Sequence, residues 1–208
     1  MKIVCIGDSI TAGERNVNDA TDLGNGYVKN LSIKLKLLLD GSEVSVINKG
    51  INGTTISDLL DRVQTDVVAE APDVVVLEGG INDVRNAVAA EEDFDVASFR
   101  NQYTALVATI KATGAKLIII EPFVLTCIAG KLKYRRYLNR AMEVIEDVGY
   151  NDAVAVVHLD EMFNGVCAGD PSEAKQWAED GIHPTHRASR HIANILISKI
   201  QNKLIAYP

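Results

Sequence analysis

Short apolar runs rich in valine and isoleucine recur along the chain. They cover residues 3–6, 44–47, 74–77, 117–120 and 154–157, and each is followed by a loop and a segment with helical spacing. Near-continuous apolar strands that alternate with helices are typical of a parallel sheet covered on both faces. The pattern therefore predicts an α/β fold, a three-layer αβα sandwich around five parallel strands.

Two of the intervening segments have a clear helical period. Apolar side chains recur every three or four positions from Phe99 to Ile110, and Gly114 supplies a stop before the next strand. Thr185 is a candidate cap for a last helix. The apolar face of that helix is formed by Ala188, Ile192, Ile195 and Ile200. Because no repeat or Pro/Ser-rich linker interrupts the alternation, we expect one domain over residues 1–208.

Composition narrows the classes of function. A chain of 208 residues can bury about 70% of its unfolded surface in one core, so it needs no metal or disulfide to fold. The 21 basic and 28 acidic side chains give a net charge of −7, which opposes binding to nucleic acid or to an anionic membrane. No apolar run approaches the roughly 18 residues of a membrane span.

The cysteines and the first residues indicate the cellular compartment of the protein. Cys5, Cys127 and Cys167 lack CxxC spacing and cannot all pair with one another, which favours a reducing compartment and gives no zinc framework. The first six residues are too short for a signal sequence, and we interpret them as a strand. We therefore expect a cytoplasmic protein.

Residues that carry chemistry in such a sheet are expected in loops at the carboxyl ends of the strands. The first strand ends in the sequence GDSIT, in which Gly7 permits a tight turn and Ser9 is placed as a nucleophile would be. An ordinary helix-capping serine or a phosphate-binding turn is the alternative. The G-x-S-x-G elbow of α/β-hydrolases is absent, because Thr11 stands at its last position.

The next two strands end in glycine-containing loops. Gly53 comes just before a predicted helix start, where its N–H is a candidate anion donor, although a plain glycine turn would look the same. The third strand runs into two glycines followed by Asn82, whose amide could point into a cleft. A turn with an Asx hydrogen bond is the alternative for Asn82.

A short motif near the C-terminus, DGIHP, places Asp180 three residues before His183. The aspartate can then hold one imidazole nitrogen and leave the other to accept a serine proton, as in a Ser-His-Asp triad. Asp8 and Asp83 are other candidates for the acid, but their distance from the imidazole depends on tertiary geometry. We expect Asp8 instead to bond to loop N–H groups and to hold the serine turn in place.

Together the four loops, from Gly7 to Pro184, resemble the blocks of the SGNH hydrolases, also called the GDSL esterase and lipase family, which carry Ser, Gly, Asn and His. The resemblance implies a flavodoxin-like five-stranded sheet and a reaction without metal or organic cofactor. It also implies a triad of Ser9, Asp180 and His183, and an oxyanion hole formed by Ser9, Gly53 and Asn82.

Residues 23–28, 48–54, 80–84 and 122–123 look more specifically like bacterial SGNH acetylxylan esterases and related sugar-ester deacetylases. Arg85 stands where those enzymes often carry Trp, and Glu121 where Thr is usual. The likeness implies a small-molecule or oligosaccharide ester as substrate and a homo-oligomer as the assembly.

Several side chains near these loops have more than one interpretation. Arg135 and Arg136 lie in a basic run, 131–137, for which we expect a role at the pocket rim or in a subunit contact. Trp177 could stack on a sugar, wall the acyl site or pack in the core. The other histidines follow no metal-binding pattern, so we expect solvated or structural roles and no metal site; they are His158, His186 and His191.

The function predicted is that of a serine carboxylic-ester hydrolase that removes acetyl or other short acyl groups, from acetylated xylo-oligosaccharides or related sugars. A general short-chain carboxylesterase, a thioesterase and a lysophospholipase are the nearest alternatives. A non-catalytic, anion-binding flavodoxin-like module is a more distant one, because a pure binder has no use for a general base.

Overall fold

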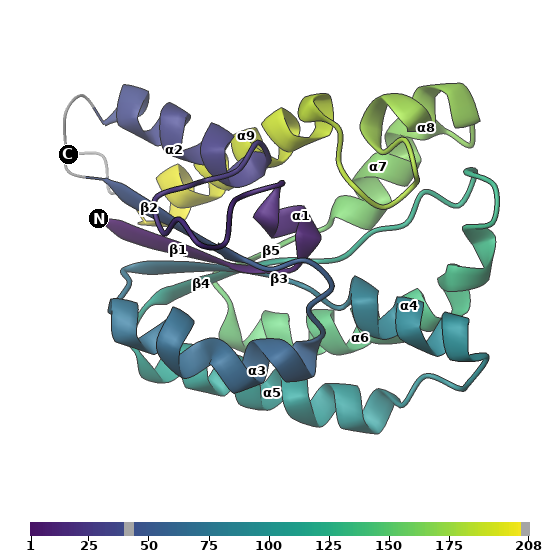
Figure 1. Ribbon diagram of the computed structural model, residues 1–208, viewed down its shortest axis with the longest axis horizontal. Helices are drawn as coiled ribbons and strands as arrows, with labels where there is room; N and C mark the ends of the chain where they lie inside the picture. Colours follow the sequence, from purple (N-terminus) through teal and green to yellow (C-terminus); the bar gives the residue numbers. More distant parts are fainter. Residues whose placement is uncertain (40–43, 205–208) are drawn as a thin grey trace.

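The computed structural model describes residues 1–39 and 44–204 and contains the predicted five-stranded parallel sheet (Figure 1). Its strands are β1 (Lys2–Gly7), β2 (Ser45–Gly50), β3 (Val74–Glu78), β4 (Lys116–Ile120) and β5 (Ala155–Val157). They lie in the order β2-β1-β3-β4-β5. The α/β class and the strand positions predicted from the apolar runs are confirmed.

Helices cover both faces of the sheet (Figure 1). On one face lie α1 (Ser9–Ala12), α2 (Tyr27–Leu38), α7 (Leu159–Cys167), α8 (Pro171–Trp177) and α9 (His186–Leu204). On the other lie α3 (Ile56–Asp66), α4 (Ile81–Ala90), α5 (Val96–Ala112) and α6 (Arg135–Asp152). Two 3₁₀ turns, Val68–Glu70 and Leu132–Tyr134, precede β3 and α6. No helix in the described part of the chain is long and apolar enough to cross a membrane.

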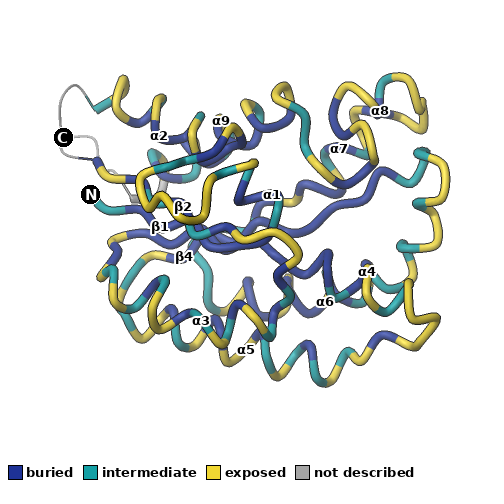
Figure 2. The backbone as a smooth tube through the Cα atoms, in the orientation of Figure 1, coloured by how far each residue is buried: buried dark blue, intermediate teal, exposed yellow. Residues whose placement is uncertain are grey.

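The core lies on both sides of the sheet, where the central strands β1, β3 and β4 are almost continuously buried, while the edge strands β2 and β5 are partly exposed (Figure 2). The predicted apolar face of α5 is buried, and this helix ends before Gly114, whose φ is +80°. In α9 the predicted cap is present, because Thr185 Oγ1 accepts the Ala188 N–H at 3.3 Å. Ile195 is only half-buried, whereas its three predicted partners on the helix face are buried.

Two glycines let the turn after β1 fold tightly against its neighbours. A Cβ on Gly7 would lie 2.2 Å from Thr11 Oγ1 and 2.6 Å from the carbonyl oxygen of Glu78. A Cβ on Gly50, at the end of β2, would lie 2.2 Å from the backbone nitrogen of Ala12. These contacts leave no room for a side chain, so both glycines are needed to bring α1 against the carboxyl end of the sheet.

Candidate active site

The structure brings together the first and last of the predicted site segments. Ser9 is the first residue of α1, directly after the N-cap Asp8. Ser9 Oγ lies 2.9 Å from Nε2 of His183, which is 174 positions away in the sequence. Nδ1 of the same imidazole lies 2.7 Å from Oδ2 of Asp180. The three side chains therefore form one hydrogen-bonded chain.

The turn before α9 fixes the Asp180 carboxylate in place. Asp180 Oδ1 accepts the N–H groups of Ile182 at 2.9 Å and of His183 at 2.8 Å, which leaves Oδ2 for the imidazole. Gly181 has a φ of +82°, a value that glycine adopts at little cost. The sequence spacing of three residues thus closes a local turn that sets the orientation of the ring.

The electrostatics of this pair favour a protonated ring and an ionised acid. The hydrogen bond to Asp180 raises the pKa of His183 above 6.5, partly offset by burial of the ring. Burial alone would raise the pKa of Asp180, but the hydrogen bonds from His183 and from the backbone outweigh it, so this pKa is lowered. The ion pair that forms when the imidazole takes up a proton is therefore stabilised.

Asp8 and Asn82 lie buried beneath the serine turn. Asp8 Oδ1 accepts the N–H of Ile10 at 2.9 Å, as predicted for a residue that holds this turn. Asn82, in the first turn of α4, donates from Nδ2 to the carbonyl oxygen of Thr54 at 3.0 Å and to Asp8 Oδ2 at 3.3 Å. The asparagine therefore links the loops that follow β1, β2 and β3.

Gly53 lies in the loop between β2 and α3, before the N-cap of that helix, as predicted. Its φ is +78°, and a Cβ added to it would meet nothing within 4 Å. The residue is exposed, and the preceding Asn52 lines the same cavity as Ser9 and His183. Glycine is thus favoured here because of the positive φ angle, and not because a side chain would clash.

The cavity beside the serine has a volume of about 440 Å³, and most of the residues that line it have polar side chains. In addition to Ser9 and His183, its polar side chains are Glu14, Asn25, Asn52, Glu179, Thr185, His186 and Ser189. Carboxylates, amides and hydroxyls of this kind form hydrogen bonds with hydroxyl-rich ligands. The space next to the serine therefore suits a polar group.

Sequence analysis missed Asn48, which lies on β2 and is fully buried. Its Nδ2 donates to the carbonyl oxygens of Thr11 at 3.0 Å and Leu23 at 2.9 Å, and its Oδ1 accepts the N–H of Gly50. These bonds fasten α1 and the following loop to the sheet. The position of this amide, directly after the apolar run 44–47, was the signal that could have revealed it.

Glu78, at the end of β3, was missed as well. Its Oε2 accepts a hydrogen bond from Thr11 Oγ1 at 2.9 Å, while its buried Oε1 has no partner. Burial, together with the neighbouring Asp8, raises the pKa of Glu78 well above its ordinary value. Burial therefore favours the neutral, protonated form of Glu78 behind the serine turn.

Asp83, the other carboxylate considered for the imidazole, contacts a different group. Its carboxylate accepts the backbone N–H of Ile56 at the start of α3, at 3.1 Å. Burial raises its pKa to about 7. The carboxylate that contacts His183 is that of Asp180.

The structure separates the two arginines that were expected at a rim or subunit contact. Arg135 is turned inward, where Nη1 lies 2.6 Å from Asp160 Oδ2 and Nη2 donates to the carbonyl oxygen of Val124 at 2.9 Å. The Arg135 guanidinium is thus bound by a buried carboxylate and a loop carbonyl, and it is not among the residues that line the cavity beside Ser9; its part in a subunit contact stays a prediction. Arg136 is exposed and lies 3.5 Å from Asp93.

Trp177 packs in the core, which was one of its three interpretations. It ends α8 and is 5% exposed, and its ring lies 5.2 Å from that of Phe163 and 5.4 Å from that of His191. Its Nε1 donates to Glu173.

The two departures from the deacetylase pattern lie in different surroundings. Arg85 is exposed on α4, and its charge helps to offset the rise that burial causes in the pKa of Asp8. Glu121 is buried and is held by His158 and by the backbone of Asp160. It is not among the residues that line the cavity beside Ser9.

Comparison with known proteins identifies relatives over almost the full chain. An acetylxylan esterase of Geobacillus stearothermophilus is 28% identical over 96% of this chain and 93% of its own length. A structure of Axe2, the acetylxylan esterase of that organism, superposes with a TM-score of 0.84 at 25% identity, over 99% of this chain and 97% of its own. LAE5, an α/β hydrolase enzyme from the metagenome of Lake Arreo, Spain, gives a TM-score of 0.83 at 25% identity, covering 99% and 96%.

Further Axe2 structures are of catalytic mutants in which a serine, an aspartate or a histidine is replaced, the last two lying three positions apart. Residues 5–191 match the model of the GDSL-like lipase/acylhydrolase family, a span that runs from β1 into α9 and includes Ser9, Asn82 and His183. The chain belongs to the GDSL-like lipase/acylhydrolase family.

Proposed function

We propose that this serine esterase removes acetyl groups from short, hydroxyl-rich carbohydrates such as acetylated xylo-oligosaccharides. The observation that carries the proposal is the hydrogen-bonded chain from Asp180 through His183 to Ser9. The Axe2 catalytic mutants support these roles, because they replace the same three residue types and their aspartate and histidine have the same spacing as Asp180 and His183.

In the proposed reaction, Ser9 Oγ attacks the ester carbonyl carbon while His183 Nε2 takes the hydroxyl proton. The protonated ring, held by Asp180, then gives this proton to the oxygen of the departing sugar hydroxyl, which leaves an acetyl group on the serine. Water attacks this acyl group with the same ring as base, and release of acetate restores the serine hydroxyl.

The oxyanion that forms in each half-reaction is assigned to three donors. These are the backbone N–H groups of Ser9 and Gly53 and the side-chain amide of Asn82. The amide is held by its 3.0 Å bond to Thr54, and the hydrogen in its longer, 3.3 Å contact with Asp8 is the one assigned to the substrate. Fixed donors of this kind stabilise the developing charge without reorganisation.

The polar cavity supports a sugar as the leaving group. Glu14, Asn25, Asn52 and Glu179 line the space beside the serine, and amides and carboxylates pair with sugar hydroxyls. The acetylxylan esterase relative supports the same substrate class.

A substrate screen tests this function. Acetylated xylo-oligosaccharides, other acetylated sugars and aryl esters of increasing acyl length are compared with wild type and Ser9→Ala. We expect hydrolysis of acetyl sugars, a steep fall in kcat/KM beyond propionyl, and loss of all activities in Ser9→Ala. A preference for acyl chains of eight or more carbons would instead indicate a lipase or lysophospholipase.

Labelling separates catalysis from simple binding. A fluorophosphonate reacts with an activated serine, so we expect mass spectrometry to place one label on Ser9 in wild type. The label is expected to be lost in His183→Ala, in which the serine remains but its base is gone. Equal labelling of the two proteins would argue against His183 as the base.

A further inference from the structure

A second group of chemically active side chains lies at the carboxyl ends of β4 and β5. Glu121 follows β4, His158 follows β5 and forms the N-cap of α7, and Glu146 reaches in from α6. One donor atom from each lies within 4.8 Å of the other two. In residues 1–39 and 44–204 this is the one group of three or more histidine, cysteine or carboxylate side chains that converge so closely.

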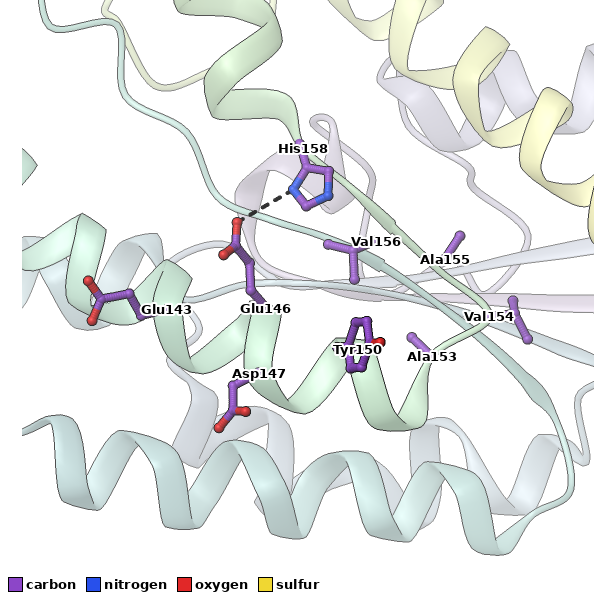
Figure 3. A pocket seen from close by; sticks show the side chains of 10 residues that line it. Glu143, Glu146, Asp147, Tyr150, Ala153, Val154, Ala155, Val156 and His158 are labelled. Carbon is purple, nitrogen blue, oxygen red and sulfur yellow. Dashed lines mark ion pairs between the residues drawn. The ribbon is translucent and has the colours of Figure 1, made fainter.

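The spacing of the donor atoms is close to that of a metal site. His158 Nδ1 lies 3.1 Å from Glu121 Oε2 and 3.7 Å from Glu146 Oε1, and Figure 3 shows the Glu146 carboxylate pointing at the ring. Ligand atoms bonded at about 2.1 Å to one tetrahedral cation lie about 3.4 Å apart. A small shift of Glu146, whose side chain is 56% exposed, would complete such a geometry.

The buried member of the group is Glu121. The Glu121 side chain is 3% exposed, and its ion-pair partner among the described residues is His158 alone. Buried carboxylates are ordinarily paired with cations or bound to metals, and a divalent cation beside Glu121 would also reach the two exposed donors, Glu146 and His158.

The surroundings hold Glu121 in place and leave one side of the group open. Glu121 Oε1 accepts the backbone N–H of Asp160 at 3.1 Å, and the Asp160 carboxylate is in turn bound by Arg135. Supporting bonds of this type orient ligands at metal sites. A cavity of about 730 Å³ adjoins the group and is lined by Glu146, His158 and two more acidic residues on α6 (Figure 3). This cavity gives water and cations access to the group.

We propose that Glu121, Glu146 and His158 bind one first-row divalent cation, such as Zn²⁺ or Mn²⁺. One imidazole and two carboxylates are a donor set that such cations accept, and water from the cavity would fill the remaining positions. The cation would replace the Nδ1 proton and connect β4, β5 and α6. Its role is stabilisation of this edge of the sheet, and it takes no part in the serine chemistry proposed above.

Titration calorimetry of the metal-free protein with Zn²⁺ and with Mn²⁺ tests the site. We expect one equivalent to bind per chain, with affinity at least about 10-fold lower in His158→Ala and in Glu146→Gln. Glu146 is exposed, so its variant is expected to fold even if a change at buried Glu121 disturbs the core. A concentration of Zn²⁺ 100 times the Kd should raise the Tm by about 5–10 °C in wild type.

Two controls assign the binding to this group. Glu143→Gln removes an acidic residue of the same helix and cavity but not of the donor set, and His183→Ala removes the exposed histidine of the serine site; both should bind like wild type. Wild-type affinity in both His158→Ala and Glu146→Gln, or no Zn²⁺ or Mn²⁺ binding to wild type below about 1 mM, would overturn the proposal. Equal affinity for Ca²⁺ would also overturn it, because Ca²⁺ takes oxygen ligands and would not need the imidazole.

Discussion

His183 determines how the proposed esterase responds to pH. The ring must be neutral to accept the serine proton, and its hydrogen bond to Asp180 raises its pKa above 6.5. We therefore expect kcat/KM to rise with pH, with a midpoint above 6.5. In Asp180→Asn the midpoint should move to lower pH, and kcat should fall by about 10⁴-fold because the ring loses its orientation. A pH–rate profile of each protein measures both effects, and a profile that is flat from about pH 5 to pH 8 in wild type would contradict the assignment.

Asn82 provides a direct test of the oxyanion hole. Loss of one such donor typically costs about 10²- to 10³-fold in kcat, so Asn82→Ala should be slow but detectable. Asn52→Ala is the matched control, since Asn52 lines the cavity but is not assigned to the oxyanion; it should change KM more than kcat. A fall in the Tm of Asn82→Ala would report the structural contribution of its bond to Thr54. A wild-type kcat in a folded Asn82→Ala protein would show that the amide does not stabilise the oxyanion.

Asp83 is expected to make stability depend on pH. Its pKa is raised from 3.8 to about 7 in the folded protein, so between these values the native state binds more protons than the unfolded state and stability falls as pH rises. Asn has no charge to bury and keeps an oxygen for the Ile56 N–H. The free energy of unfolding of Asp83→Asn, relative to that of wild type, should therefore increase by about 1–2 kcal/mol between pH 4 and pH 8. This is less than the full pKa shift would give, because Asp83 is only half-buried. Denaturant unfolding at the two pH values measures this, and a constant difference between the proteins would refute it.

At the scale of elements, the Arg135–Asp160 pair couples α6 and α7 to the loop after β4. That loop reaches the serine site, because the Leu125 N–H donates to the carbonyl oxygen of Gly181 at 2.9 Å. Arg135→Ala would leave the buried Asp160 without its partner and should cost about 3 kcal/mol in the free energy of unfolding. The exposed Arg136→Ala should cost less than about 0.5 kcal/mol. Equal stability of the two variants would show that the inward ion pair contributes nothing.

The elements themselves were largely predictable because their signals are local. Apolar runs located all five strands, and the spacing of three residues between Asp180 and His183 anticipated the bond between them. The basic run at 131–137 gave no sign of the ion pair of Arg135, since its partner Asp160 comes from α7, 25 positions away. The role of Glu78 was hidden for the same reason, as its contacts with Asp8 and Thr11 exist only after β1 and β3 pair.

At the scale of the whole molecule, charge should affect the choice of substrate. The chain carries a net charge of −7, and Glu14 and Glu179 line the cavity beside the serine. An ester of a sugar acid should therefore react more slowly than its neutral counterpart at low ionic strength, and the difference should shrink as added salt screens the charges. Measurements of kcat/KM for a matched pair of esters from about 0.01 to 0.5 M NaCl test this. A salt-independent ratio would show that shape alone discriminates.

The distance along the chain between Ser9 and His183 has a consequence for when activity can begin. The proposed nucleophile belongs to the first strand–helix turn, and its proposed base comes just before the final helix. A nascent polypeptide on the ribosome would stay inert until nearly all of it had emerged and α9 had docked beside α2. For the same reason, two inactive halves divided between β3 and β4 would each hold one part of the proposed triad, so recovered turnover would report their reassembly.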